Sequence, residues 1–222
     1  DWLEIDRIEG RAIDVGYYRH HVDPMQPFAL SMRPHIHGIG ITSATLRDST
    51  DNEEEDWKSA HALTGMDYMG GQIHQIALPS PFDYAAHTKV FIINDVRKDN
   101  MNQLAGAYRS LFEASGGGAL GLFTAISRLR AVHERIAPGL EERGMPLYSQ
   151  HIDEIDAGSL VDMFREDIHA CLLGTDAVRD GVDVPGQSLR LLVFDRVPWP
   201  RPTLLHKARR EAFGGRNYDE ML

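Results

Sequence analysis

The sequence predicts an α/β protein built on a parallel β-sheet with helices on both faces. Two observations lead to this fold class. Short runs of consecutive apolar residues recur between residues 118 and 197, as is typical of strands that are buried on both faces. Between these runs, apolar residues stand three and four positions apart, which is the spacing of helices with one buried face. Alternating strands and helices favour a parallel sheet, because each helix returns the chain to the start of the next strand.

The N-terminal part predicts a small region of strands and loops. Short alternating segments at residues 11–15 (RAIDV) and 28–32 (FALSM) stand among several prolines. Residues 38–46 (GIGITSATL) form an apolar, branched run that ends in hydroxyl side chains, so we expect a buried strand there that delivers a loop to the edge of a sheet. The polar run at 46–52 is the expected domain boundary.

Residues 53–112 predict two helices with a strand between them. The spacing of Trp57, Ala60 and Thr64 predicts a helix that Gly65 closes. Residues 89–95 (KVFIIND) predict another buried strand. The next segment carries apolar residues at helical spacing from Met101 to Phe112, and the glycines of SGGG end it.

The remainder predicts four strands and three helices. The strands are expected at 118–125 (GALGLFTA), 146–150 (PLYSQ), 169–175 (HACLLGT) and 188–197 (SLRLLVFDRV). The helices are expected at 127–136 (SRLRAVHERI), where Pro138 interrupts the pattern, at 158–167 (GSLVDMFRED) and at 203–213 (TLLHKARREAF).

Composition narrows the class of protein. The chain has 222 residues, of which 42% are hydrophobic, which is enough for a substantial core in one or two domains. No run of about eighteen apolar residues and no secretory signal occurs, so we expect a cytoplasmic protein. The single cysteine, Cys171, excludes an internal disulfide or a cluster held by several thiolates, and its apolar surroundings predict a buried small residue.

The net charge of −10 has the wrong sign for a stand-alone nucleic-acid binder, but the charge is unevenly spread. Residues 48–56 hold six acidic groups and predict a solvated loop or a helix start. Residues 190–216 hold seven basic groups against two acidic ones, which makes them a candidate phosphate-facing surface. Because the chain starts with Asp1 and ends in a helical pattern without a stop signal, we expect both ends to be internal to a longer protein.

Two groups of titratable residues receive a structural interpretation. The histidines at 19–21 and 35–37 lack a third ligand at a recognisable spacing, so no metal site is expected. Asp153 and Asp156, near His151, are interpreted as a helix cap or loop rather than as acid–base catalysts.

Ligands of open parallel sheets bind at the carboxyl ends of the strands. This rule selects the loops at 42–45 (TSAT), 123–127 (FTAIS), 148–151 (YSQH) and 174–186 (GTDAVRDGVDVPG). Hydroxyl groups near the start of these loops, together with free backbone amides, suit phosphate oxygens. In the longest loop the glycines permit close approach to a ligand, and Asp183 can accept from a ribose or hold a metal-bound water; a purely structural turn is the alternative.

These motifs stand in an order that resembles a known family. The series is TSATL (42–46), SPFD (80–83), GGGALGLFTA (116–125), PLYSQ (146–150), LLGTDAVRDGVDVPG (172–186) and LVFDRVPWPRP (192–202). It resembles the second half of DinG-type, XPD-related superfamily 2 DNA helicases, from about residue 38 to residue 222. The resemblance implies a RecA-like second motor domain at 48–222, preceded at 1–47 by the end of the first motor domain.

The resemblance also implies roles for individual residues. Ser43 and Thr45 would couple the nucleotide site to the DNA site. Thr124 and Thr175 would contact the phosphates of single-stranded DNA. Gly181 and Asp183 would face the nucleotide across the cleft between the motor domains.

The chain departs from the family pattern at several positions. The FTA at 123–125 stands where the family more often has FTS. Asp180 replaces a common glutamate, Arg179 replaces a usual tryptophan, and Trp199 replaces a usual phenylalanine. The change at Arg179 concerns how this loop packs rather than which family the chain resembles.

Parts of the motor that the resemblance implies are not in this sequence. It holds neither a G-x-x-x-x-G-K-[ST] loop for ATP phosphates nor a D-E-x-H acid pair for Mg²⁺, so we expect ATP and Mg²⁺ to be bound only by the longer protein and this chain to be inactive alone. The final arginine motif is expected after Leu222, and any iron–sulfur cluster outside this chain. The expected partners are single-stranded DNA and the first motor domain of the same polypeptide.

Two other functions remain open from the sequence. One is a non-catalytic α/β module that binds nucleic acid or protein, and the other is an unrelated α/β enzyme that binds phosphoryl groups. A Walker loop upstream and a glutamine–arginine motif shortly downstream would identify the motor.

Overall fold

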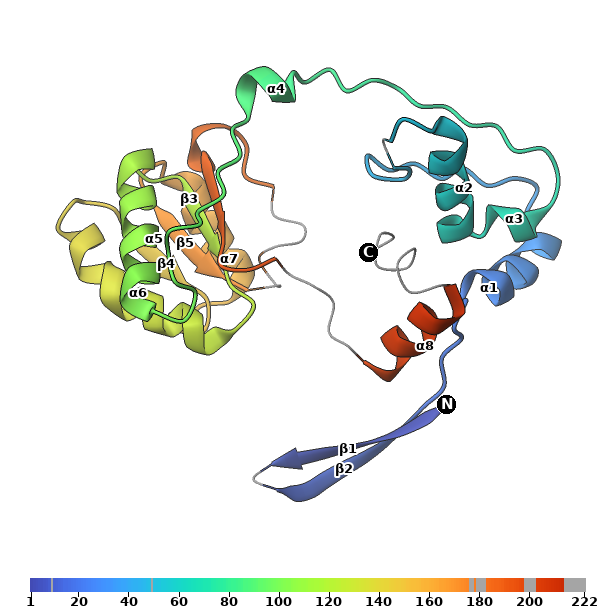
Figure 1. Cartoon of the computed structure of the whole chain (residues 1–222), viewed down its shortest axis with the longest axis horizontal. Coiled ribbons are helices and arrows are strands. Elements are labelled where there is room, and N and C mark those ends of the chain that lie inside the picture. Colours follow the sequence, from blue (N-terminus) through green and yellow to red (C-terminus); the bar gives the residue numbers. More distant parts are fainter. Residues whose placement is uncertain (9, 49, 176–177, 179–182, 198–202, 214–222) are drawn as a thin grey trace. The chain divides into compact units, whose positions relative to one another are not determined.

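The computed structural model describes residues 1–222 except 9, 49, 176–177, 179–182, 198–202 and 214–222. The chain forms two compact units (Figure 1). One comprises Asp1–Phe82 together with Pro200–Leu222, and the other comprises Asp83–Trp199. The assignment of residues 1–47 and 48–222 to two successive motor domains stays a prediction. Each unit is described by itself below.

The Asp83–Trp199 unit contains the predicted parallel sheet. Its strands are β3 (Ala119–Leu122), β4 (Leu147–Ser149), β5 (Cys171–Gly174) and β6 (Leu191–Phe194). All neighbours are parallel, in the order β4-β5-β3-β6. Each strand lies inside one of the four predicted runs. The central strands β3 and β5 are buried on both faces, as expected of apolar runs in a parallel sheet. The edge strand β6 is not, because its Leu192 and Phe194 side chains are exposed.

Helices cover both faces of this sheet, as predicted. Helices α5 (Met101–Ser115) and α6 (Ile126–Glu141) pack together on one face, and α7 (Ala157–Glu166) packs on the other. The largest buried side chains of the first layer are Tyr108, Phe112, Leu129, Ile136 and Leu140. The second layer is built around Leu160, Phe164 and Leu172. Two cores on one sheet are what the alternation of strands and helices requires.

The helix ends follow the local sequence. Asn100 caps α5, its side chain accepting from the backbone N–H groups of Asn102 and Gln103. The same helix ends at Gly116, whose φ of 67° is left-handed, in agreement with the predicted stop at SGGG. Asp156 caps α7, which confirms its interpretation as a cap.

The predicted interruption at Pro138 is wrong. Helix α6 continues through this proline to Glu141. Proline removes one backbone hydrogen bond, but here it lies in the last turn of the helix. Ile136 and Leu140 are both buried, so packing on each side of the proline holds the helix together.

The other unit begins with an antiparallel hairpin of β1 (Trp2–Ile8) and β2 (Arg11–Tyr18). It continues with α1 (Met25–Met32), a 3-10 turn at Arg33–His35, α2 (Glu53–Thr64) and α3 (Met66–Met69). The predicted C-terminal helix is α8 (Leu204–Phe213), and the Nε of Arg209 donates to the carbonyl of Val22 at 3.1 Å. The Asp83–Trp199 unit also contains two short elements, α4 (Tyr84–His87) and a 3-10 turn at Gly186–Ser188.

Three predicted strands are not found. Residues 28–32 belong to α1, because Pro24 and Pro27 lie at its start, where proline is compatible with a helix. Residues 38–46 and 89–95 form no strand. A strand needs a neighbour for its backbone hydrogen bonds, and none of the described residues pairs with either segment. Val90 and Ile92 are therefore 85% and 87% exposed rather than buried.

The acidic run at 48–56 is a helix start, as predicted, but it is not fully solvated. Asn52 caps α2, and Asp56 is buried. The Asp56 carboxylate accepts from the Thr50 hydroxyl at 2.6 Å and from the Thr50 N–H, and it pairs with Arg47 at 3.2 Å. This carboxylate fixes the chain that follows the TSAT segment against α2.

In the described parts of the chain, no helix combines the length and the apolar character needed to cross a membrane.

Candidate nucleic-acid interface

The four parallel strands end at one edge of the sheet, where the predicted loops begin. Backbone hydrogen bonds continue across this edge just past the strands: Gln150 N–H donates to Leu173, Phe123 N–H to Gly174, and Asp195 N–H to Leu122. The residues that follow the strands therefore form a row in the order of the sheet. Three of the four predicted loops meet here, those that start at Phe123, at Tyr148 and at Gly174. We call this row the carboxyl edge.

Thr175 follows β5, in the middle of the carboxyl edge. Both its N–H and its hydroxyl lie 2.9 Å from the Oε1 atom of Gln150. The Nε2 atom of His151 lies 3.1 Å from the same hydroxyl oxygen. Gln150 is buried and His151 is exposed, so a buried amide orients Thr175 while an imidazole flanks it on the solvent side.

Thr124 follows the neighbouring strand β3 and is exposed. It stands just before α6, whose N-cap residue Ala125 has no side chain that could cap the helix. The first N–H groups of a helix carry partial positive charge and lack partners within the helix, so an uncapped start favours an anion. The predicted phosphate residues Thr124 and Thr175 thus end adjacent strands, next to a helix start that can receive a phosphate.

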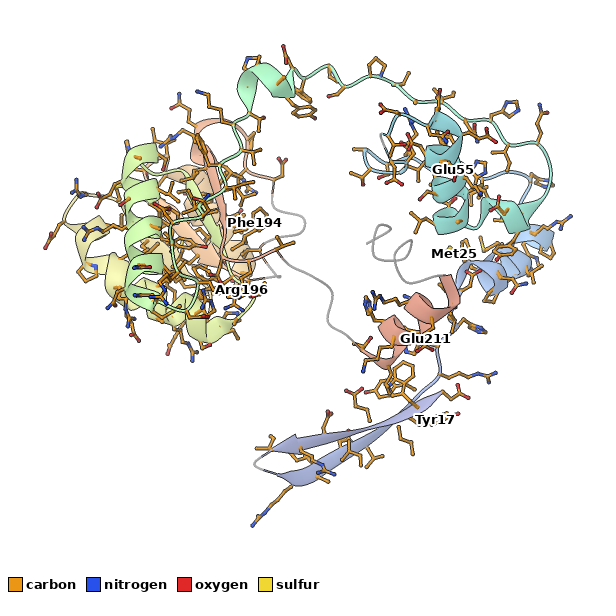
Figure 2. All side chains as sticks on the ribbon, in the orientation of Figure 1. Tyr17, Met25, Glu55, Phe194, Arg196 and Glu211 are labelled. Carbon is orange, nitrogen blue, oxygen red and sulfur yellow. The ribbon has the colours of Figure 1, made fainter. Side chains whose placement is uncertain are left out.

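A buried ion pair joins the first turn of α6 to Asp195, the residue that follows β6; the last residue of β6, Phe194, is labelled in Figure 2. The Arg128 guanidinium donates to both carboxylate oxygens of Asp195, at 2.7 and 2.6 Å. The Asp195 side chain is fully buried and that of Arg128 is 14% exposed. A bidentate pair of this kind sets the orientation of both partners. It fixes the start of α6, next to Thr124, relative to Asp195 of the LVFDRVPWPRP segment at 192–202.

Beneath the carboxyl edge, a second polar group links α6 to β4. His133 Nδ1 lies 2.7 Å from the hydroxyl of Ser149, and the Ser149 N–H donates to Asp153 at 2.7 Å. Ser149 is fully buried. Burial lowers the pKa of His133, although the Asp153 charge acts in the opposite direction. The neutral imidazole is therefore the form that the fold prefers.

This pKa shift predicts a loss of stability in mild acid. The pKa of a histidine in an unfolded chain is about 6.5. Folding lowers the pKa of His133 below that value. The stability that the neutral His133 side chain contributes to the fold is present above the unfolded pKa. It is lost as the pH falls through the pKa of His133 in the folded protein. The melting temperature should therefore fall between pH 7.5 and 5.5, and it should fall less in His133→Gln, which cannot be protonated. An equal fall in both proteins would contradict this assignment.

Ser43 and Thr45 lie in the Asp1–Phe82 unit. Both are exposed, the Ser43 hydroxyl accepts from the Thr45 N–H at 3.1 Å, and the two side-chain oxygens are 3.4 Å apart. The Arg47–Asp56 pair anchors the residues that follow them. The TSAT segment is thus a turn stabilised by its own hydroxyl groups, rather than the end of a strand.

Asp183 is exposed, and its backbone is held in place. Its carbonyl accepts two hydrogen bonds from the Arg165 guanidinium of α7, at 3.1 and 2.9 Å. The next residue, Val184, is buried in the α7 layer. Asp183 is therefore fixed on the α7 face of the sheet, whereas Thr175 is held by Gln150, the residue after β4. Gly181, the other predicted nucleotide-facing residue, lies outside the described residues, as do Arg179, Asp180 and Trp199.

The prediction that Cys171 is a buried small residue is confirmed. It is fully buried in β5, and burial raises the pKa of its thiol to about 12. The thiolate form is thus suppressed at neutral pH, and the residue packs as a small apolar side chain.

The comparisons with known proteins agree with the order of the motifs. A family model described as "Helicase C-terminal domain" matches residues 108–221, just over half of the chain. The chain belongs to this helicase family. This match confirms the α/β fold with a RecA-like sheet, and, together with the relatives that follow, it confirms the resemblance to DinG-type helicases.

The curated relatives carry helicase names and are much longer than this chain. "ATP-dependent DNA helicase YoaA" of Escherichia coli (strain K12) is 30% identical over 158 residues, which cover 68% of this chain and 24% of the relative. "ATP-dependent helicase DinG" of Mycobacterium tuberculosis (strain H37Rv) is 39% identical over 107 residues, 48% of this chain and 15% of the relative. "3'-5' exonuclease DinG" of Bacillus subtilis (strain 168) is 28% identical over 218 residues, 95% and 23%. The chain spans about a quarter or less of these relatives.

Proposed function

We propose that this chain is the C-terminal motor part of an ATP-dependent DNA helicase, and that its carboxyl edge contacts the phosphates of single-stranded DNA. The proposal rests on one observation above all. In a chain of the helicase C-terminal family, Thr124 and Thr175 end adjacent strands beside the uncapped start of α6. Hydroxyl groups and backbone amides bind phosphate without reading the base, which suits a protein that moves along a strand.

The nucleotide roles follow from the same proposal. ATP, held with Mg²⁺ between two motor domains, would supply the free energy of phosphoryl transfer. Asp183 is suited to face that nucleotide, because its carboxylate is exposed while Arg165 fixes its backbone. Gly181 would stand beside it, and Ser43 and Thr45 would couple the nucleotide to DNA. The phosphate-binding loop, the remainder of the first motor domain and any iron–sulfur cluster would lie in the rest of the whole protein, which we place in the cytoplasm.

The DNA role is tested by Thr175→Ala in the whole protein. Losing a hydrogen bond to a charged phosphate should weaken binding of single-stranded DNA about tenfold. The chain itself offers a matched control, Ser110→Ala, which removes an exposed hydroxyl from α5 and should leave binding unchanged. Fluorescence anisotropy of a labelled oligonucleotide, measured at several salt concentrations, gives both affinities. Binding that does not depend on salt would contradict phosphate recognition.

The nucleotide role is tested by Asp183→Ala. We expect the DNA-stimulated ATPase rate of the whole protein to fall at least tenfold, while the affinity for single-stranded DNA in the absence of nucleotide stays within about twofold of wild type. A non-catalytic module would show no ATPase activity in the wild-type protein. An unchanged rate in the variant would remove Asp183 from the nucleotide site.

A further inference from the structure

The first turn of α2 contains one carboxylate that is buried although its neighbours are not. Asp56 is 2% exposed, whereas Glu53, Glu54 and Glu55 of the same turn are exposed. These exposed acids already suit the partial positive charge at the start of the helix. Burying a further carboxylate costs free energy unless its oxygens are paired. The position of Asp56 is therefore explained by what its oxygens bind rather than by the charge of the helix end.

The Asp56 carboxylate binds the loop that follows the TSAT segment. The Thr50 N–H nitrogen lies 3.2 and 3.0 Å from its two oxygens, and the Thr50 hydroxyl donates to Oδ1 at 2.6 Å. Arg47 Nη1 donates to Oδ2 at 3.2 Å. The next residue of α2, Trp57, contacts the same guanidinium, since its ring centre lies 5.5 Å from Arg47 Cζ. Consecutive side chains of α2 thus hold this loop at two points.

The TSAT segment has few other attachments. Ser43 and Thr45 bond to each other, and no hydrogen bond joins either residue to another element in the described part of the chain. Thr42 and Leu46, on either side of this pair, line one groove together with residues of α2. Arg47 follows Thr45 by only two residues. Its ion pair with α2 is therefore the polar contact that anchors the turn at 43–45.

We propose that Asp56 is the positioning residue of this turn. By holding Arg47 against α2, it makes the turn and the helix one rigid element. A displacement of Ser43 and Thr45 is then passed on to α2 instead of being lost in a flexible loop. This inference rests on the proposed function, which assigns coupling to those two residues. Asp56 itself contacts neither nucleotide nor DNA in this role.

Asp56→Asn in the whole protein is the decisive variant. The amide keeps the shape of the side chain and an oxygen for Thr50, but it removes the charge that pairs with Arg47. The number of base pairs unwound per ATP hydrolysed should fall at least about fivefold, the lower end of typical coupling between sites. The DNA-stimulated ATPase rate should stay within about twofold of wild type, because the residues of the nucleotide site are unchanged.

Glu55→Gln is the matched control. It removes one charge from the same turn of α2, together with the ion pair of Glu55 and Lys58 at 3.7 Å (Figure 2). The Glu55 side chain is 62% exposed, and a surface pair of this kind contributes little. Unwinding per ATP should therefore equal that of wild type. An equal loss in both variants would assign the effect to the charge of the helix end and would overturn the role of Asp56.

Arg47→Met tests whether Asp56 acts through Arg47. It should lower unwinding per ATP as Asp56→Asn does. The double variant, which leaves neither charge of the pair, should be no worse than either single variant. Destabilisation alone would lower ATP hydrolysis and unwinding in proportion and leave their ratio unchanged, and that result would overturn the positioning role.

The outcomes separate this inference from the function on which it rests. A wild-type ratio in Asp56→Asn, together with a lowered ratio when Ser43 and Thr45 are both replaced by alanine, would overturn the role of Asp56 and leave the proposed function standing. Absence of ATP-dependent unwinding in the wild-type protein would overturn both.

Discussion

Arg128→Ala should destabilise the Asp83–Trp199 unit by about 3–5 kcal/mol, because it leaves the Asp195 carboxylate buried without its partner. The Asp195 side chain has no exposed area, and both of its oxygens accept from Arg128. Hydrogen exchange of the β3 and β5 amides measures this free energy within the unit itself.

Two further variants show whether burial is the cause. Arg109→Ala removes an exposed arginine of α5 that lies 3.4 Å from Glu113, and it should cost less than about 1 kcal/mol. The double variant Arg128→Met with Asp195→Leu should be more stable than Arg128→Ala, because it removes the uncompensated charge. Equal costs for Arg128→Ala and Arg109→Ala would show that the pair contributes no more than a surface ion pair.

The Arg128–Asp195 pair also marks what the sequence could not predict. The two residues are 67 positions apart, and neither carries a local signal for the other. The same holds for Gln150, whose amide meets Thr175 only because β4 and β5 are neighbours. Three of the four loops were predictable, since a rule about parallel sheets places them at one edge. The contacts between loops depend on strand order, which a single sequence does not specify.

Strand prediction succeeded where the chain supplies the neighbours of a strand. The runs that became β3 and β5 pair with each other and are buried. The run at 89–95 is just as apolar, yet Val90 and Ile92 are exposed. Apolar branched residues therefore indicate a capacity to form a strand, and pairing decides whether that capacity is used. Local signals were more reliable at helix ends, because Asn100 and Gly116 act through the adjacent backbone alone.

Gly117→Ala should destabilise the same unit by about 3 kcal/mol. Gly117 lies in the turn between α5 and β3, and its φ of 91° disfavours any side chain. A Cβ atom there would lie 2.3 Å from the carbonyl oxygen of His169, so the backbone before β5 would have to move. Strain and overpacking of this kind each cost about 1–3 kcal/mol.

Gly106→Ala provides the matched control and should have the opposite sign. Gly106 lies within α5, and a Cβ atom there would meet no atom within 4 Å. Alanine should therefore stabilise the helix by up to about 1 kcal/mol. Hydrogen exchange of the β3 amides reports both changes. If Gly117→Ala were also neutral or stabilising, the close approach of the GGG turn to the backbone of His169 would not exist in solution. The turn lies at the amino edge of the sheet, so single-stranded DNA binding by the folded variant should stay at the wild-type level.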